Sequence, residues 1–348
     1  AAKYGGGIFL LVYIILALTF GYTLIMAETS LGRMTRKSPV GAFESFGNSR
    51  FISIGGWINA IIPILIVPYY SVIGGWVIKY LIEYFAGHSK TLAGDAYFTT
   101  FISNGWSTEI CFIIFTLFTL GIIYAGVRNG IERVSRFMMP ILIVLSLIIA
   151  VYSVTRPGAI EGVKYFLVPN FDHFSWMTVV SAMGQMFYSL SIAMGILITF
   201  GSYMKKDTSI EKSTENVEIF DTAIAIMAGL MIIPAVFAFS GGNAETLKSG
   251  PALMFITIPK VFANMGFGTA IGVVFFLLVL FAAVTSSIAL TESAVSTFED
   301  ELHWSRKKST VFMGMVMLLL GTLSCLGYGP LANFKILGMQ FLDFFDFI

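Results

Sequence analysis

Residues 184–195 read GQMFYSLSIAMG and lie inside a hydrophobic run, with WMTVVSAM before them and ILITFGSYM after them. A Gln, a Tyr, two Ser and two Gly stand near the middle of this run. Two interpretations are open. The small residues could let neighbouring helices pack closely, with the serines bonded to their own backbone. Alternatively, the helix is interrupted here, and its free carbonyl and amide groups hold ions and a carboxylate.

The composition identifies the environment of this run. The chain has 348 residues, of which 57% are hydrophobic and only 12% are charged, whereas soluble domains carry roughly 25% charged residues. A soluble protein this poor in charge could not cover its surface with polar groups, so the composition predicts an integral, polytopic membrane protein. The net charge of +1 gives no indication of a nucleic-acid partner.

Membrane-spanning helices can be located by length, since a span needs about 20 mostly apolar residues. Eight candidates are present: 7–27, 56–85, 108–126, 137–155, 176–204, 217–241, 267–291 and 309–328. The segments after the first, third, fifth and seventh candidates hold 13 basic residues, and the remaining segments hold seven. The positive-inside rule therefore places the first set in the cytoplasm, and the first span begins outside.

The two ends of the chain suggest further helices. The chain opens with AAKYGGGIFLL, without an initiator Met, and closes with FLDFFDFI, a pattern typical of the start of another span. A chain that begins outside without a signal sequence is explained most simply if one helix precedes it. We therefore expect residues 1–348 to be a single membrane domain that is truncated at both ends.

Several polar residues lie at membrane depth. Thr285 and Ser286 are adjacent hydroxyls in a span, and they could either pack between helices or, with a free carbonyl, provide oxygen ligands for sodium. Glu28 and Asp221 are acids within apolar segments. Because ionisable residues are costly at membrane depth, both are candidates for a functional role by default. Glu28 could equally cap the broken backbone of another helix. Tyr70, in PYYSVIGGW, could pack against aromatic neighbours or donate to a substrate carboxylate.

Enzyme chemistry finds no support in the sequence. The patterns HExxH, GxSxG and the phosphate-binding loop are absent. Transport energised by an ion gradient, rather than by ATP, is the function class that remains.

Taken together, these motifs resemble one family, the neurotransmitter:sodium symporters, and in particular their bacterial amino-acid transporters. The matching segments occur in the family's order: GGGIFLLVYIILALTFGYTLIMAETSLGR, PYYSVIGGW, NGIERVSRFMMP, GQMFYSLSIAMGILITFGSYM, GPALMFITIP, AAVTSSIAL and FEDELHWSRKK. The resemblance implies an all-α integral membrane protein with the inverted-repeat fold of the bacterial leucine transporter. The chain would cover about helices 2–9 and the start of helix 10, and residues 184–204 would be the unwound sixth helix.

The resemblance also implies a substrate site. Its residues are Tyr70, Ile66, Tyr188, Ser189, Ser191, Met194 and Leu290. In this site Tyr70 hydrogen-bonds the substrate carboxylate, and Tyr188 is an aromatic lid where the family usually has Phe. Ile66, Met194 and Leu290 offer an uncharged wall to the substrate side chain.

Two sodium sites follow from the same resemblance. Their ligands in this chain are Ser189, Asp221, the Ala282 carbonyl, Thr285 and Ser286. Asp221 stands in the region where the family has an Asn in the first sodium site. Because a sodium ion in a low-dielectric site needs a compensating anion, we expect the fixed charge of Asp221 to make external chloride unnecessary.

Gates complete the implied machinery. Tyr188 and Asp346 belong to the outer gate, and Tyr203 and Asp300 belong to the inner gate. The arginine partners of both gates would lie on the preceding helix 1, which also supplies ligands to both sodium sites. The chain without that helix is therefore not expected to transport.

For the full-length protein, the sequence predicts sodium-coupled symport of a small neutral amino acid, hydrophobic or aromatic, across the plasma membrane. Its partners would be this amino acid and the lipid bilayer, with no organic cofactor. Two alternatives stay open. One is a proton-coupled transporter of the same fold, in which Glu28 or Asp221 titrates. The other is an amino-acid sensor that binds without transporting. The sequence carries no signal for the oligomeric state.

Overall fold

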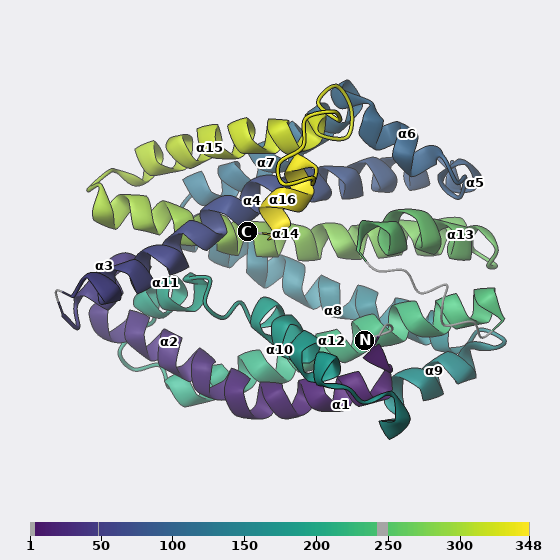
Figure 1. Ribbon diagram of the computed structural model, residues 1–348, viewed down its shortest axis with the longest axis horizontal. Coiled ribbons are helices and arrows are strands. Elements are labelled where there is room, and N and C mark those ends of the chain that lie inside the picture. Colours follow the sequence, from purple (N-terminus) through teal and green to yellow (C-terminus); the bar gives the residue numbers. More distant parts are fainter. Residues whose placement is uncertain (1–3, 48, 242–249, 348) are drawn as a thin grey trace.

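The computed structural model describes residues 4–47, 49–241 and 250–347, and Figure 1 shows their arrangement. Within these residues the chain forms helices joined by turns, with two isolated β-bridges, Gly6–Pro169 and Ile336–Met339. The prediction of an all-α fold is confirmed. Helices α1 (Gly7–Leu16) and α2 (Tyr22–Thr35) are continuous through a π-helical turn at Ala17–Gly21. The other long helices are α4 (Arg50–Phe85), α7 (Gly105–Tyr124), α8 (Arg133–Val154), α10 (Trp176–Ser189), α12 (Ile210–Ser240), α14 (Gly268–Glu301) and α15 (Arg306–Leu326).

Shorter helices connect the long ones and cover their ends. They are α3 (Pro39–Glu44), α5 (Ser89–Leu92), α6 (Tyr97–Ser103), α9 (Ala159–Leu167), α11 (Ile196–Tyr203), α13 (Ile258–Ala263) and α16 (Phe341–Phe347), with a π-helical turn at Val127–Glu132, another at Leu253–Thr257 and a 3-10 turn at Phe171–His173. The sequence also predicts a short hairpin of helices around Pro251 and Pro259 in the external segment 240–262, of which residues 242–249 lie outside the described residues.

Seven continuous helical segments in the described part of the chain are long and apolar enough to cross a membrane. They correspond to seven of the eight predicted spans. The remaining predicted span, 176–204, is divided into α10 and α11, each too short to cross the hydrocarbon core alone, since a span needs about 20 residues. The chain is therefore a multi-pass membrane protein with one interrupted span.

The interruption occupies residues 190–195, between α10 and α11, and Figure 1 shows it as a non-helical segment. Three of its residues adopt left-handed backbone conformations: Ser191 (φ 55°), Ala193 (φ 62°) and Gly195 (φ 67°). Such conformations are costly for Ser and Ala, because the Cβ approaches the following carbonyl oxygen. Their occurrence at two neighbouring non-glycine residues indicates a conformation that the surrounding helices hold in place.

Close helix contacts hold the second half of this span. Helix α11 packs against α2, where a Cβ on Gly32 would overlap the Ile198 carbonyl oxygen and a Cβ on Gly201 would lie 2.5 Å from the Thr29 carbonyl oxygen. Small residues at such contacts let two helix backbones approach closely in a membrane. Helix α14 packs extensively on α4, and this pair forms the wall that faces the break.

We expect the substitution Gly32→Ala to force α2 and α11 apart. Overpacking of this kind lowers the free energy of unfolding by about 1–3 kcal/mol, which thermal unfolding of the detergent-purified protein can measure. The matched control is Gly121→Ala, because a Cβ on Gly121 meets nothing within 4 Å. Equal thermal stability of the two variants would contradict the proposed contact.

Candidate functional site

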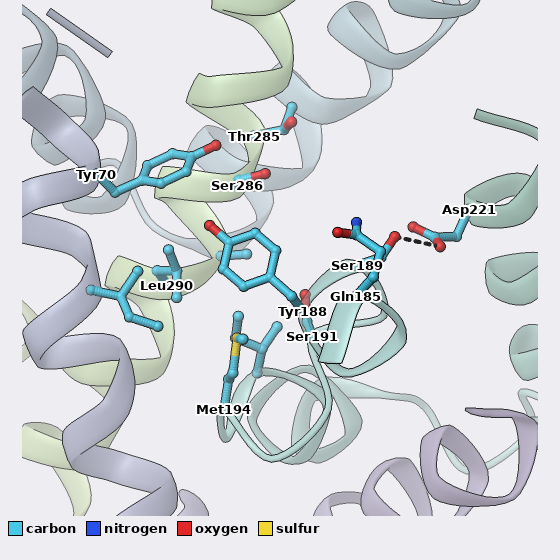
Figure 2. A pocket seen from close by; sticks show the side chains of 13 residues that line it. Tyr70, Gln185, Tyr188, Ser189, Ser191, Met194, Asp221, Thr285, Ser286 and Leu290 are labelled. Atoms are coloured by element: carbon cyan, nitrogen blue, oxygen red, sulfur yellow. Dashed lines mark hydrogen bonds between the residues drawn. The ribbon is translucent and has the colours of Figure 1, made fainter. Parts of the chain in front are cut away.

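A cavity of about 430 Å³ lies beside the break in the interrupted span. Its walls come from the middle of α4, the end of α10 with the following break and the first residue of α11, one turn of α12 and the middle of α14 (Figure 2). Ten of the predicted substrate and sodium residues line it: Ile66, Tyr70, Tyr188, Ser189, Ser191, Met194, Asp221, Thr285, Ser286 and Leu290. Gln185, Ile196 and Ala289 complete the lining.

An anionic corner of the cavity forms where α1, α10 and α12 meet. The Ser189 hydroxyl donates to Asp221 Oδ2 at 2.8 Å, and the Tyr13 hydroxyl donates to the same oxygen at 3.0 Å. Figure 2 shows Asp221 and Ser189 at one end of the cavity. Hydrogen bonds from two hydroxyls favour the charged form of a carboxylate, so this corner places a hydrogen-bonded acidic group next to the broken backbone.

Hydroxyl groups from α4 and α14 form the opposite side. The Tyr70 hydroxyl points toward Ser286, and the Thr285 hydroxyl lies nearby (Figure 2). The Thr285 hydroxyl donates to the Ala282 carbonyl at 3.0 Å and to the Phe281 carbonyl at 3.1 Å. Ala282 itself is absent from the cavity lining, and its carbonyl oxygen is engaged by Thr285. These are hard oxygen donors, the ligand type that suits an alkali cation.

The third side of the cavity is apolar. Met194 and Leu290 lie on this side (Figure 2), and Ile66 is a further apolar residue of the cavity lining. Among the described residues that line the cavity, Asp221 is the only one with a charged type of side chain. Tyr188 projects across the cavity between this side and the hydroxyls, and 48% of its surface is exposed. The cavity thus combines an anionic corner, a row of hydroxyls and a hydrophobic wall.

Glu28 of α2 lies at the break rather than in the cavity lining. Its Oε1 accepts a hydrogen bond from the Ala193 amide at 2.8 Å. The amide of a residue in an interrupted helix has lost its helical acceptor, and in hydrocarbon such a group must find another. Glu28 therefore has the structural role of capping the broken backbone, one of the two roles that the sequence left open.

At the outer side, Asp346 of α16 contacts the aromatic residues of the mouth. Its Oδ1 accepts from the Tyr69 hydroxyl at 2.9 Å, and its charge also acts on Tyr188. Asp346 thus contacts Tyr69 rather than Tyr188 directly, and its pairing with Tyr188 in an outer gate stays a prediction. Tyr69, the neighbour of Tyr70, holds the carboxylate there.

At the inner side the two predicted gate residues have different partners. Asp300 accepts a hydrogen bond from the Ser38 amide. Tyr203 instead donates to Glu292 Oε1 at 2.7 Å. Glu292 is fully buried within α14, and it forms an ion pair with Arg306 of α15 at 2.6 Å.

Two residues with prominent contacts, Tyr13 and Glu292, were missed in the sequence, and Gln185, noted there as polar, was not assigned to the cavity that it lines. Tyr13 and Gln185 stand in quoted motifs, but neither carries a charge that draws attention to it. Glu292 lies in IALTES, seven residues before Glu299 and eight before Asp300, and it is easily attributed to a polar helix end. Its acidic side chain so deep in a span was the signal that could have identified it.

An interrupted helix that opens onto a cavity lined by oxygen atoms and a hydrophobic wall is the architecture of a secondary transporter. Comparison with known proteins agrees. The model of the family described as Sodium:neurotransmitter symporter family matches residues 1–112 and 98–346. The chain is 33% identical to the uncharacterised sodium-dependent transporter YhdH of Bacillus subtilis, over 100% of this chain and 77% of the relative. It is 30% identical to a sodium-dependent transporter of Haemophilus influenzae, over 99% and 77%.

The fold is also that of a solved structure. The crystal structure of MhsT in complex with L-phenylalanine superimposes with a TM-score of 0.89 at 35% identity, covering 100% of this chain and 79% of MhsT. The chain belongs to the sodium:neurotransmitter symporter family. It is a transporter rather than an enzyme, and its fold is the inverted-repeat fold that the sequence predicted.

The buried ion pair generates a stability prediction. Replacing Glu292 by Gln removes the nearer of the two carboxylates that pair with the Arg306 guanidinium and leaves Glu299, at 3.4 Å, as its partner. Breaking a buried pair costs about 3–5 kcal/mol, and the remaining pair with Glu299 places the expected loss toward the lower end of that range. Tyr203→Phe is the matched control, because it removes one hydrogen bond from the same carboxylate and costs about 1 kcal/mol. Thermal unfolding in detergent compares the two, and a smaller loss for Glu292→Gln than for Tyr203→Phe would refute the assignment.

Proposed function

We propose that the protein carries a small neutral amino acid with a hydrophobic or aromatic side chain across the plasma membrane, together with sodium. Sodium dependence and amino-acid transport follow from the family. The substrate class rests on one observation, the composition of the cavity. Its side-chain wall consists of Ile66, Met194 and Leu290, and its only carboxylate, Asp221, is engaged with two hydroxyl donors.

The cavity suggests a role for each group in the bound state. Sodium would be held by hydroxyl oxygens and by the carboxylate of Asp221, which compensates its charge. The hydroxyl of Tyr70 would donate to the carboxylate of the substrate. The side chain of the substrate would contact Met194, whose flexible thioether adapts to different shapes. Because Tyr188 projects across the cavity, it would cover the bound amino acid.

The comparison with MhsT supports this substrate class. That protein was crystallised with L-phenylalanine and shares 35% of its sequence with this chain. An aromatic substrate would find Tyr188 on one side and the apolar wall on the other. The oxygen-lined corner would accommodate only the polar end of the same molecule.

Uptake into proteoliposomes that contain the full-length protein tests the substrate class. We expect sodium-dependent accumulation of radiolabelled leucine, methionine or phenylalanine at least tenfold above that of lysine and glutamate, because burying an unpaired charge against the apolar wall is costly. Faster uptake of the charged pair would refute the assignment. Accumulation driven by a pH gradient without sodium would instead favour the proton-coupled alternative, and saturable binding without uptake would favour the sensor.

Chloride independence is a separate proposal. Asp221 already provides a negative charge, held by Tyr13 and Ser189, at the corner where the first sodium ion would bind. We therefore expect sodium-driven uptake to keep its rate, within about twofold, when external chloride is replaced by gluconate. A large loss of uptake in gluconate would show that a mobile anion is required.

A further inference from the structure

Helix α12 carries a row of carboxylates that ends at the cavity. The row consists of Glu211, Glu215, Glu218 and Asp221, at spacings of four, three and three residues. With 100° per residue these spacings keep all four side chains within a sector of about 120°, and the row spans about 15 Å along the helix. Asp221 lies in the cavity lining at one end, and Glu211 lies in the first turn of α12 at the other.

Burial increases along this row from Glu211 to Glu218, one turn before the cavity. Glu211 and Glu215 are exposed, whereas Glu218 retains only 5% of its surface. Glu218 lies one helical turn from Asp221, about 4.5 Å along the axis. The row therefore leads from solvent into the protein.

The polar atoms around Glu218 lack partners. Among the residues that the structure describes, Glu218 Oε1 and the hydroxyls of Thr214 and Thr222 are buried and make no hydrogen bond. Thr214 and Thr222 stand one turn before and one turn after Glu218 on the same face. A threonine in a helix can bond back to a preceding carbonyl, as Thr285 does, so hydroxyls without that bond remain free to bind something else.

The row faces α2 and starts at the cytoplasmic side. Glu211, Glu215 and Glu218 all act electrostatically on the same phenol, Tyr22 of α2, and α12 packs on α2. Helix α12 begins just after the basic segment that the positive-inside rule places in the cytoplasm. The Arg33 guanidinium of α2 donates hydrogen bonds to the backbone carbonyls of Lys206 and Thr208 in that segment.

We propose that this carboxylate row, with Thr214 and Thr222, is the route by which sodium leaves the Asp221 site for the cytoplasm. The inference rests on the proposed sodium-coupled function. Glu218 is an intermediate cation site on this route, with carboxylate and hydroxyl oxygens as ligands.

The physical reason is the cost of an isolated buried carboxylate. An ionised carboxylate without partners is very unfavourable in a low-dielectric interior, and the side chain gains stability when a cation passes beside it. Hydroxyl and carboxylate oxygens are the ligands that a hard cation prefers. A structural role in helix packing would leave both carboxylate oxygens hydrogen-bonded, as is the case for Glu292.

The test separates sodium release from substrate movement. In proteoliposomes, net uptake driven by a sodium gradient requires sodium to leave at the cytoplasmic side, whereas exchange of labelled for unlabelled substrate with saturating sodium on both sides does not. We expect Glu218→Gln to slow net uptake about tenfold, because one negative charge on the route is removed, and to leave exchange within about twofold of the wild type.

Matched variants make the result specific. Asp207→Asn removes an exposed charge next to α12 but outside the row, and it should change neither rate. Glu218→Asp keeps the charge and should restore most of the net uptake. If the Glu218→Gln variant does not accumulate as folded protein, Glu215→Gln, at an exposed position of the row, replaces it. That variant is expected to slow net uptake by less than the tenfold expected for Glu218→Gln and to leave exchange at the wild-type rate.

Two outcomes would overturn the inference. Net uptake at the wild-type rate in Glu218→Gln, or in Glu215→Gln where that variant replaces it, would show that the row is not on the route. An equal loss of net uptake and exchange would indicate a general defect instead. A wild-type protein without sodium-driven uptake would overturn the proposed function as well, so the two failures are distinguishable.

Discussion

The structure depends on one constraint, the need to satisfy the backbone of an interrupted helix inside the membrane. Residues 190–195 give up helical hydrogen bonds in a setting where no water replaces them. The Glu28 carboxylate accepts from the Ala193 amide, and the tight packing of α11 on α2 fixes the second half-helix. Only because these contacts stabilise the break can the free backbone and side-chain oxygens of the same segment face a cavity.

This constraint explains why the fold could be predicted from the sequence. A break in a membrane helix needs small residues and polar side chains where apolar ones are expected, and GQMFYSLSIAMG supplies both. Length and hydropathy indicated the remaining spans for the same reason, since a bilayer imposes a minimum length of about 20 residues. The substrate and sodium residues followed from motifs, and ten of them line one cavity.

The contacts of the gate residues and of Tyr13 could not be predicted, because they depend on pairings between distant segments that no local sequence pattern encodes. Tyr203 and Asp300 were expected at one inner gate, but Tyr203 bonds Glu292 and Asp300 bonds the Ser38 amide. The choice between these partners depends on the rotation of α14 and α15 about their axes, which brings Arg306 to Glu292. Tyr13 was similarly hidden, because its role arises only where α1 approaches Asp221.

The buried acids of this protein fall into two groups that differ in whether their oxygens are satisfied. Glu292 receives hydrogen bonds from Tyr203 and Arg306 and connects α11, α14 and α15, which suits a group that keeps helices in place. Glu218 is almost as buried, yet one of its oxygens has no partner among the described residues. A transporter needs both kinds of site. A carboxylate whose oxygens are all hydrogen-bonded or ion-paired stabilises the scaffold, but it has no free oxygen for a cation. A buried carboxylate with an unpaired oxygen lowers the stability of the protein, and a bound cation restores that stability while it is present.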